Sequence, residues 1–164
     1  MQDWQVATDY LKVHEWLCAS DRYHATATSP APQRNPETTR RHVLAGVVHE
    51  LYQGGALVGT FTLTDAAPHG MDPQVFGDER PAVYLQRLVV APDSLEQGAL
   101  VGLRCVTRAC ELARSRQAEV IRAEVNPALQ HVYKLLLALG FKQVGTILHD
   151  AEHRQRVNMQ RVLV

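Results

Sequence analysis

Hydrophobic positions recur along the chain with two different periods, and this separates the predicted helices from the predicted strands. Between residues 98 and 116 apolar residues return every three or four positions, which predicts an amphipathic helix. Its buried face is expected to carry Ala99, Leu103, Val106, Cys110 and Ala113. Helical spacing also predicts helices over Thr8–Ala19, Pro36–Leu44 and Asn126–Gly140. Apolar or alternating runs predict strands over Val47–Tyr52, Ala56–Leu63, Ala82–Val90, Val120–Val125, Gln143–Leu148 and Arg156–Val164.

Turn-forming residues bound several of these elements. Asn35 before Pro36 is typical of an N-cap followed by proline at the first helical position, and Asn126-Pro127 repeats that pattern. Gly54-Gly55 favours a tight hairpin turn. Two longer segments rich in proline or glycine, Ser20–Pro36 and Asp65–Pro81, are expected to be loops. Loops of this length either bind ligands or are plain surface excursions.

The order of the elements defines the fold class. Ala82–Val125 is a strand–helix–strand unit, which implies one parallel pair inside an otherwise antiparallel sheet. We therefore expect an α/β (α+β) fold with a mixed, mostly antiparallel sheet of six or seven strands, flanked by helices. The 164 residues fit one domain spanning residues 1–164.

Composition and charge narrow the function classes. The chain is 46% hydrophobic and 21% charged, as in folded globular proteins, and 17 Lys+Arg balance 17 Asp+Glu. A neutral chain has no overall field to attract nucleic acid or an anionic membrane, so we expect neither as a partner. With no apolar run of eighteen residues and no signal-peptide pattern, a cytoplasmic protein is expected. The three cysteines lack zinc-binding spacing, and no metal site is expected.

A combination of motifs then resembles a known family. Leu85-Gln86-Arg87-Leu88-Val89-Val90-Ala91-Pro92, a helix start rich in Gln and Gly, Asn126, and the ending Leu139-Gly140-Phe141 together resemble the GNAT acyltransferase superfamily. The match covers most of the chain from about Val47. The resemblance implies a sheet splayed open after its central strand. It also implies that acyl-CoA pairs its pantetheine with the backbone of Leu88, Val89 and Val90, and that its pyrophosphate sits on the N-terminus of the next helix.

The pyrophosphate loop departs from the family pattern Arg/Gln-x-x-Gly-x-Gly/Ala. In the preferred alignment Gln97 takes the first position and Gly102 the last, while Leu100 replaces a glycine. The cofactor contacts implied by the resemblance then fall on Gln97, Gly98, Ala99, Val101 and Gly102. The alternative alignment places Leu95 at the Arg position and Glu96 beside the diphosphate, where charge repulsion of roughly 3 kcal/mol would make the chain a poor CoA binder.

The resemblance also implies acid–base residues. Tyr133 stands seven residues after Asn126, where the family often places the general acid that protonates the CoA thiolate; it is equally compatible with a core aromatic. Asn126 is expected to orient the pantetheine or nucleotide, although an N-cap role explains it too. For the general base the favoured candidate is Glu124, at the carboxyl end of its strand. The other candidates are Glu50, His24 and His49.

The function expected is acyl-CoA-dependent N-acyl transfer. Acetyl-CoA would donate to a primary amine, on a small molecule or peptide, by direct attack in a ternary complex, with a strand N–H polarising the carbonyl. Arg22, Tyr23 and His24 are the first candidates for acceptor contacts. Two alternatives stay open: a non-catalytic binding module of the same fold, and an acyltransferase that uses a carrier-protein thioester. A homodimer through the C-terminal strands is also left open.

Overall fold

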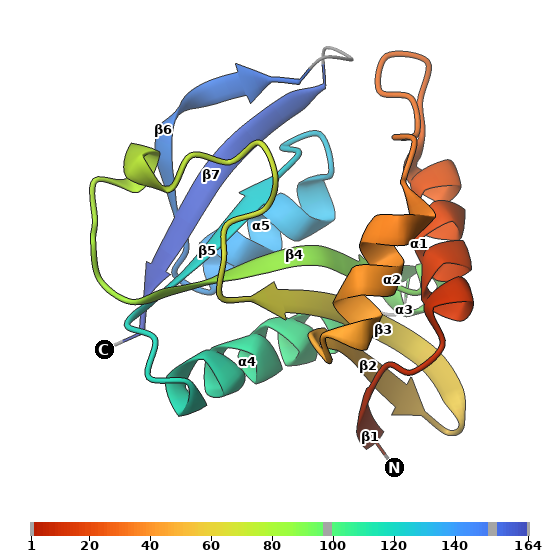
Figure 1. The fold of residues 1–164 in the computed structure, drawn as a ribbon. Coiled ribbons are helices and arrows are strands. Elements are labelled where there is room, and N and C mark those ends of the chain that lie inside the picture. Colours follow the sequence, from red (N-terminus) through yellow and green to blue (C-terminus); the bar gives the residue numbers. More distant parts are fainter. Residues whose placement is uncertain (1, 97–99, 151–153, 164) are drawn as a thin grey trace. The chain divides into compact units, whose positions relative to one another are not determined.

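The computed structural model describes residues 2–96, 100–150 and 154–163, and its strands form a seven-stranded sheet (Figure 1). The strands are β1 (Gln2–Val6), β2 (Val48–Gln53), β3 (Ala56–Thr64), β4 (Ala82–Val90), β5 (Val120–Val125), β6 (Lys142–His149) and β7 (Gln155–Val162). The helices are α1 (Tyr10–His24), α2 (Pro36–Leu44), α3 (Pro92–Glu96), α4 (Leu100–Ser115), α5 (Gln130–Ala138) and the short 3-10 helix η1 (Pro73–Phe76).

The sheet is mixed, as the element order predicts. Its strand order is β1-β2-β3-β4-β5-β7-β6. The pairing of β4 with β5 is parallel, whereas β1–β2, β2–β3, β5–β7 and β6–β7 are antiparallel. The expected fold class is therefore confirmed. Strand β1 is the one strand that the hydrophobic pattern did not predict, because its five residues carry too few buried positions to show a period.

The chain divides into two compact units, Met1–Thr62 with Arg87–Cys105 and Leu63–Gln86 with Val106–Val164. In the first unit, α1 and α2 lie in contact with each other. A core cluster fixes them on the sheet and consists of Ala7, Val13, Leu17, Val43, Val48 and Val89. At its edge the Trp16 indole Nε1 donates to the Thr60 hydroxyl over 3.0 Å, which satisfies a polar atom next to apolar packing.

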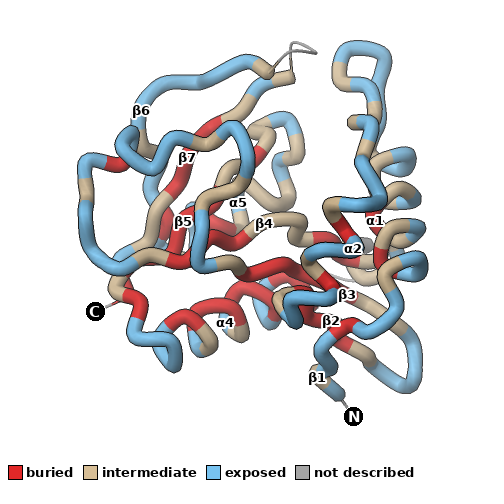
Figure 2. Tube along the Cα trace, viewed as in Figure 1, coloured by how far each residue is buried: buried red, intermediate tan, exposed pale blue. Residues whose placement is uncertain are grey.

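The second unit has its own core around β5 and β7. Its largest fully buried side chains are Ile121, Leu136, Phe141 and Met159. The C-terminus of α5 closes on this core, since the Phe141 N–H donates to the Leu136 carbonyl over 3.0 Å and the Gly140 N–H donates to the Leu137 carbonyl over 3.1 Å. Gly140 has φ of +88°, so the expected glycine stop is a Schellman cap. Buried positions follow β4, β5, β7 and one side of α4 in Figure 2.

Several helix boundaries differ from the sequence prediction. Helix α1 continues to His24, so the following loop is shorter than expected; residues 20–24 contain neither Pro nor Gly to end it. Residues 92–96 form α3 instead of an extended linker. The Asn126 side chain does not cap α5, because its Oδ1 accepts from the Ala128 N–H over 2.9 Å and closes a turn ahead of the helix. The Asn35 cap of α2 is confirmed, with Oδ1 accepting from the Glu37 N–H over 2.9 Å.

The buried face of α4 is rotated relative to the expected one. Val106, Cys110 and Ala113 are buried as expected, whereas Leu103 is 37% exposed. Val101, Gly102, Cys105 and Ala109 are buried in addition. The reason lies in β3, where Gly59 lets the helix come close. A Cβ atom at Gly59 would lie 2.9 Å from both the Cys105 Sγ and the Val101 Cγ1. Ala99 lies outside the described residues.

Candidate functional site

The strand predicted to hold the acyl donor, β4, pairs with β5 along only the first part of its length. The parallel pairs of β4 with β5 run from Ala82↔Val120 to Leu85↔Ala123, and β4 then continues to Val90. Within the continuation Leu88 is partly buried, and Val89 and Val90 are buried. Just beyond the strand, the Ala91 N–H donates to the Val58 carbonyl over 2.9 Å, so the chain remains attached to β3.

Arg87 lies two residues after Leu85, the last residue of β4 that pairs with β5, and its backbone conformation is unusual. Its φ is +54°, in the left-handed region that side chains other than glycine rarely adopt. In the described part of the chain, Gln117 is the other non-glycine residue with positive φ, and it lies in the turn after α4. Such a conformation inside a strand redirects the side chain, as a β-bulge does.

The redirected Arg87 side chain lies among polar side chains of α1, α2 and the segment between them. We call this cluster the polar group around Arg87, and it consists of Arg87, Thr39, Asp21, Arg34 and His42. The Arg87 Nη1 donates to the Thr39 hydroxyl over 3.1 Å, and Thr39 is 0% exposed. The nearby carboxylate of Asp21 is occupied by Arg34, whose Nε and Nη2 donate over 2.5 and 2.9 Å. Burial, and then the charges of Arg34 and Arg41, lower the pKa of Arg87 to about 10, and Asp21 opposes that shift. This cation therefore has no carboxylate partner of its own among the described residues.

His42 of α2 belongs to the same polar group. Its Nδ1 is buried and has no hydrogen-bond partner within the described ranges. Burial lowers the pKa of His42 to about 4, and the charges of Arg87 and Arg41 add to the shift. The imidazole is thus neutral at pH 7 and stands beside an excess of positive charge.

The predicted acceptor residues lie in the last turn of α1, and not in a loop. Arg22 and Tyr23 are exposed, and the Tyr23 ring meets the His24 ring edge-on with centroids 4.9 Å apart. Burial lowers the pKa of His24, and the charge of Asp21 opposes the shift. The three residues are consecutive in α1, and their role as acceptor contacts stays a prediction.

Two of the predicted base candidates lie on β2, and both are buried. Burial raises the pKa of Glu50, while Lys12 and the Tyr52 hydroxyl oppose the rise. His49 points to the opposite face of the strand and stacks on Phe61 with ring centroids 5.0 Å apart. The contacts of His49 are those of a packed core side chain.

The other predicted catalytic residues belong to the second unit. The Glu124 carboxylate accepts from Arg156 Nη1 over 2.7 Å. The Tyr133 hydroxyl donates to the Gln143 Oε1 over 3.2 Å, and the tyrosine is partly buried, so it is not a core aromatic. Asn126 forms the turn before α5 described above. The structure places Glu124 and Asn126 at the carboxyl end of β5 and Tyr133 in the first turns of α5.

Of the predicted cofactor loop, the structure describes only the second half. Val101 and Gly102 are buried in the first turn of α4, and Leu100 is 59% exposed. The exposure of Leu100 means that its side chain does not fill the core. Gln97, Gly98 and Ala99 lie outside the described residues.

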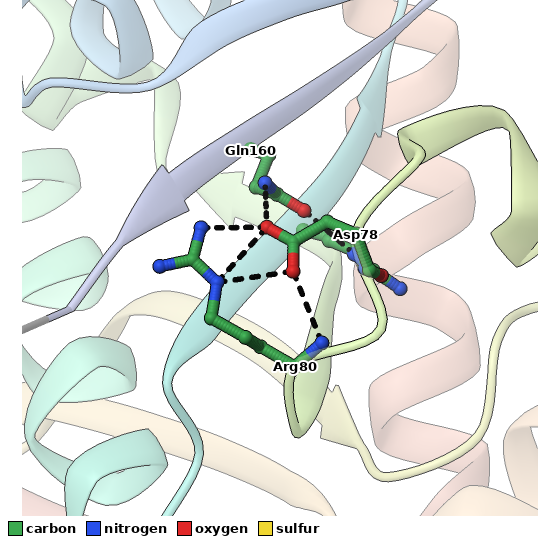
Figure 3. A network of polar contacts seen from close by, with 4 residues as sticks. Asp78, Arg80 and Gln160 are labelled. Carbon is green, nitrogen blue, oxygen red and sulfur yellow. Dashed lines mark hydrogen bonds and ion pairs between the residues drawn. The ribbon is translucent and has the colours of Figure 1, made fainter.

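Within the second unit, a buried arginine of β5 holds the loop between β3 and β4. Arg122 donates to the Tyr84 hydroxyl over 2.9 Å, to the Gln160 Oε1 over 2.8 Å and to the Asp78 carbonyl over 2.5 Å. Gln160 and Arg80 in turn hold the Asp78 carboxylate, as Figure 3 shows, and the hydrogen bonds from Arg80 keep the pKa of Asp78 well below its usual range. Each of these hydrogen bonds joins two residues of the protein, so the network holds the loop between β3 and β4 in place.

A pocket of about 1060 Å³ lies beside this network. It is lined by Asp65, Gln74, Asp78, Arg80, Tyr84 and Arg122, among others. Over the described ranges no group of three or more His, Cys, Asp or Glu residues is arranged to hold a metal ion. In the same part of the chain, no helix has the length and apolar character needed to cross a membrane.

Sequence reasoning missed the polar group around Arg87. A signal for it was present, because Arg87 is a lone cation inside the apolar run Leu85–Val90. Its positive φ and its contact with Thr39, 48 positions away in the chain, leave no trace in local sequence.

Comparison with known proteins identifies the family. A model of the acetyltransferase (GNAT) family matches residues 10–141. The chain belongs to this family of acyl-CoA-dependent N-acyltransferases. A search of curated proteins finds no match.

Solved structures share the fold at low sequence identity. A GNAT acetyltransferase from Listeria monocytogenes is 18% identical, with a TM-score of 0.72 over 98% of this chain and 94% of that one. A ribosomal-protein-alanine N-acetyltransferase from Brucella melitensis is 18% identical, with a TM-score of 0.67 over 98% and 99%. A putative acetyltransferase from Salmonella typhimurium, solved with acetyl-CoA, is 16% identical, with a TM-score of 0.67 over 99% and 94%.

Proposed function

We propose that the protein transfers an acetyl group from acetyl-CoA to a primary amine of a small molecule or peptide. The observation that carries the proposal is the course of β4. Its parallel pairs with β5 end at Leu85, and the strand continues to Val90 with Arg87 in a left-handed conformation between the two parts. Family membership and the Salmonella relative solved with acetyl-CoA support the choice of donor.

The donor would be held mainly by backbone groups. The N–H and C=O groups of Leu88–Val90 would pair with the pantetheine, and one N–H would polarise the thioester carbonyl. The diphosphate would bind around Gln97–Gly102, where backbone N–H groups at a helix start suit an anion. Holding the thioester in one orientation lowers the entropic barrier to attack by the amine.

Proton transfers would complete the reaction. The amine loses a proton as it attacks, the tetrahedral adduct expels the CoA thiolate, and the thiolate takes up a proton. We assign protonation of the thiolate to the Tyr133 hydroxyl, which in the described part of the chain donates to the Gln143 amide oxygen. For the first step Glu124 and Glu50 are the carboxylate candidates. Glu124 forms an ion pair with Arg156, and burial raises the pKa of Glu50.

Thermal unfolding in the presence of acetyl-CoA and CoA tests donor binding. A ligand at 100 times its Kd adds about 2.7 kcal/mol of stability, which raises Tm by several degrees. The variant Leu100→Gly restores the family glycine, and we expect it to bind CoA more tightly. The absence of a shift at millimolar CoA would contradict the proposal and favour a non-catalytic module or a carrier-protein donor. Glu124→Gln and Glu50→Gln, compared for turnover at equal donor saturation, identify the base.

A further inference from the structure

Arg87 is a partly buried cation with most of its donors unused. A guanidinium offers five N–H donors, and in the described part of the chain Arg87 spends one of them, on the Thr39 hydroxyl over 3.1 Å. A charge removed from water needs a partner of opposite sign. The carboxylate closest to this role, Asp21, already holds a two-point contact with Arg34.

The surroundings of Arg87 contain further positive charge, which Asp21 compensates only in part. Arg34 and Arg41 both lower the pKa of Arg87, which means that their charges are felt at the guanidinium. His42 contributes a buried Nδ1 with no partner within the described ranges, and the charge of Arg87 reaches it as well. An unpaired guanidinium fork and an unpartnered ring nitrogen are the groups that a planar anion would satisfy together.

The backbone of Arg87 indicates that this placement is maintained against a cost. Its φ of +54° is unfavourable for a residue with a Cβ atom. A strand with ordinary φ at this position would direct the side chain differently. This conformation directs the Arg87 guanidinium toward Thr39 of α2, within the first unit. Arg87 is also the residue directly before Leu88, where the proposed donor site begins.

We propose that Arg87 and His42 form a carboxylate-binding site that recognises the acceptor, so that the amine substrate is an amino acid with a free carboxylate. This rests on the proposed function, because it assumes that the thioester is held at Leu88–Val90. The guanidinium of Arg87 would bind the carboxylate in a forked contact, and His42 would donate from Nδ1–H.

The test compares amino acids with their carboxamides, with each concentration expressed as the deprotonated amine, because the carboxylate also raises the pKa of the α-amine. Glycine and each L-amino acid with a primary α-amine are assayed against their carboxamides with acetyl-CoA, with thiol release as the readout. For the accepted side chain we expect kcat/KM to be about 10- to 100-fold higher for the acid, the value of a charged hydrogen-bond pair. The ratio belongs to the wild-type protein and needs no variant to be informative.

Variants test whether the acid-to-amide ratio of kcat/KM depends on Arg87. In Arg87→Gln the acid-to-amide ratio falls toward one, while KM for acetyl-CoA is unchanged; Arg87→Lys keeps the charge, loses the fork and gives an intermediate ratio. Arg40→Gln is the matched control, since Arg40 is an exposed arginine of α2 paired with Glu37, and it should leave the ratio unchanged. The His42 ring gives a second readout by NMR, because a carboxylate bound beside it raises its pKa.

The outcomes separate this inference from the proposed function. Equal turnover of acids and amides by the wild type, or an unchanged ratio in Arg87→Gln, would overturn the carboxylate site and leave the acetyltransferase intact. Absence of any acetyl transfer would count against the proposed function. The site would then be judged by thermal shift and by the His42 pKa with the free amino acids, and no carboxylate-dependent effect would overturn it. Equal stabilisation by inorganic phosphate would overturn the choice of a carboxylate.

Discussion

Removing the hydroxyl of Tyr133 should lower the rate of catalysis strongly while changing the stability of the fold little. In the structure the hydroxyl donates a single neutral hydrogen bond to the Gln143 Oε1, over 3.2 Å, from a partly buried tyrosine. A bond of this kind contributes about 0.5–1.5 kcal/mol, so Tyr133→Phe should lower Tm by only a few degrees. A general acid typically contributes about 10²- to 10⁴-fold to the rate. We therefore expect kcat to fall at least 100-fold in a variant that is nearly as stable as the wild type.

The assay follows thiol release at saturating acetyl-CoA, with the Kd for CoA measured in parallel. The Kd should change less than twofold, because the proposed donor contacts are backbone groups of β4. Gln143→Ala is the control: it removes the hydrogen-bond partner and leaves the hydroxyl, so kcat should change little. A Tyr133→Phe variant with wild-type kcat would refute the assignment. An equal loss in Gln143→Ala would show instead that the effect is one of positioning.

Two further predictions concern the first unit. Gly59→Ala places a Cβ atom 2.9 Å from the Cys105 Sγ and the Val101 Cγ1, and we expect a loss of about 1–3 kcal/mol in urea unfolding. Adding Cys105→Ala should recover part of that loss, and wild-type stability of Gly59→Ala would contradict the close packing. The second concerns His42, whose pKa of about 4 in the folded chain lies below the ordinary 6.5. Because the unfolded chain takes up this proton more readily, the stability from neutral His42 is present above pH 6.5 and is lost as the pH falls toward 4. The partly exposed ring, beside Arg87, should give a loss of about 1–2 kcal/mol, smaller than full burial would give. His42→Asn should remove that part of the pH dependence, and an identical pH profile in the variant would refute the assignment.

Local signals in the sequence were sufficient for most of the fold. The Asn35 cap, the Gly54-Gly55 turn and the Gly140 stop each depend on neighbouring residues, and each was predicted where it occurs. Positions that depend on distant residues were not. Leu103 was expected to be buried, and it is exposed because the rotation of α4 is set by Gly59 on another element.

The same distinction holds for the candidate site. Tyr133 and Glu124 could be named from spacing and resemblance, and their roles remain predictions. The polar group around Arg87 could not be assembled from the sequence, since it joins β4 with α1 and α2 through side-chain contacts and one unusual φ angle. A lone arginine in an apolar strand was its visible trace.

The most direct test of the account is to follow the acyl group itself. The protein is incubated with acetyl-CoA labelled with carbon-13 in the acetyl group and with a panel of amino acids, other small primary amines and peptides, and the products are identified by mass spectrometry. We expect a labelled N-acetyl product and one equivalent of free CoA for each transfer. Labelled acetyl-CoA that remains intact, with every amine unmodified, would contradict it.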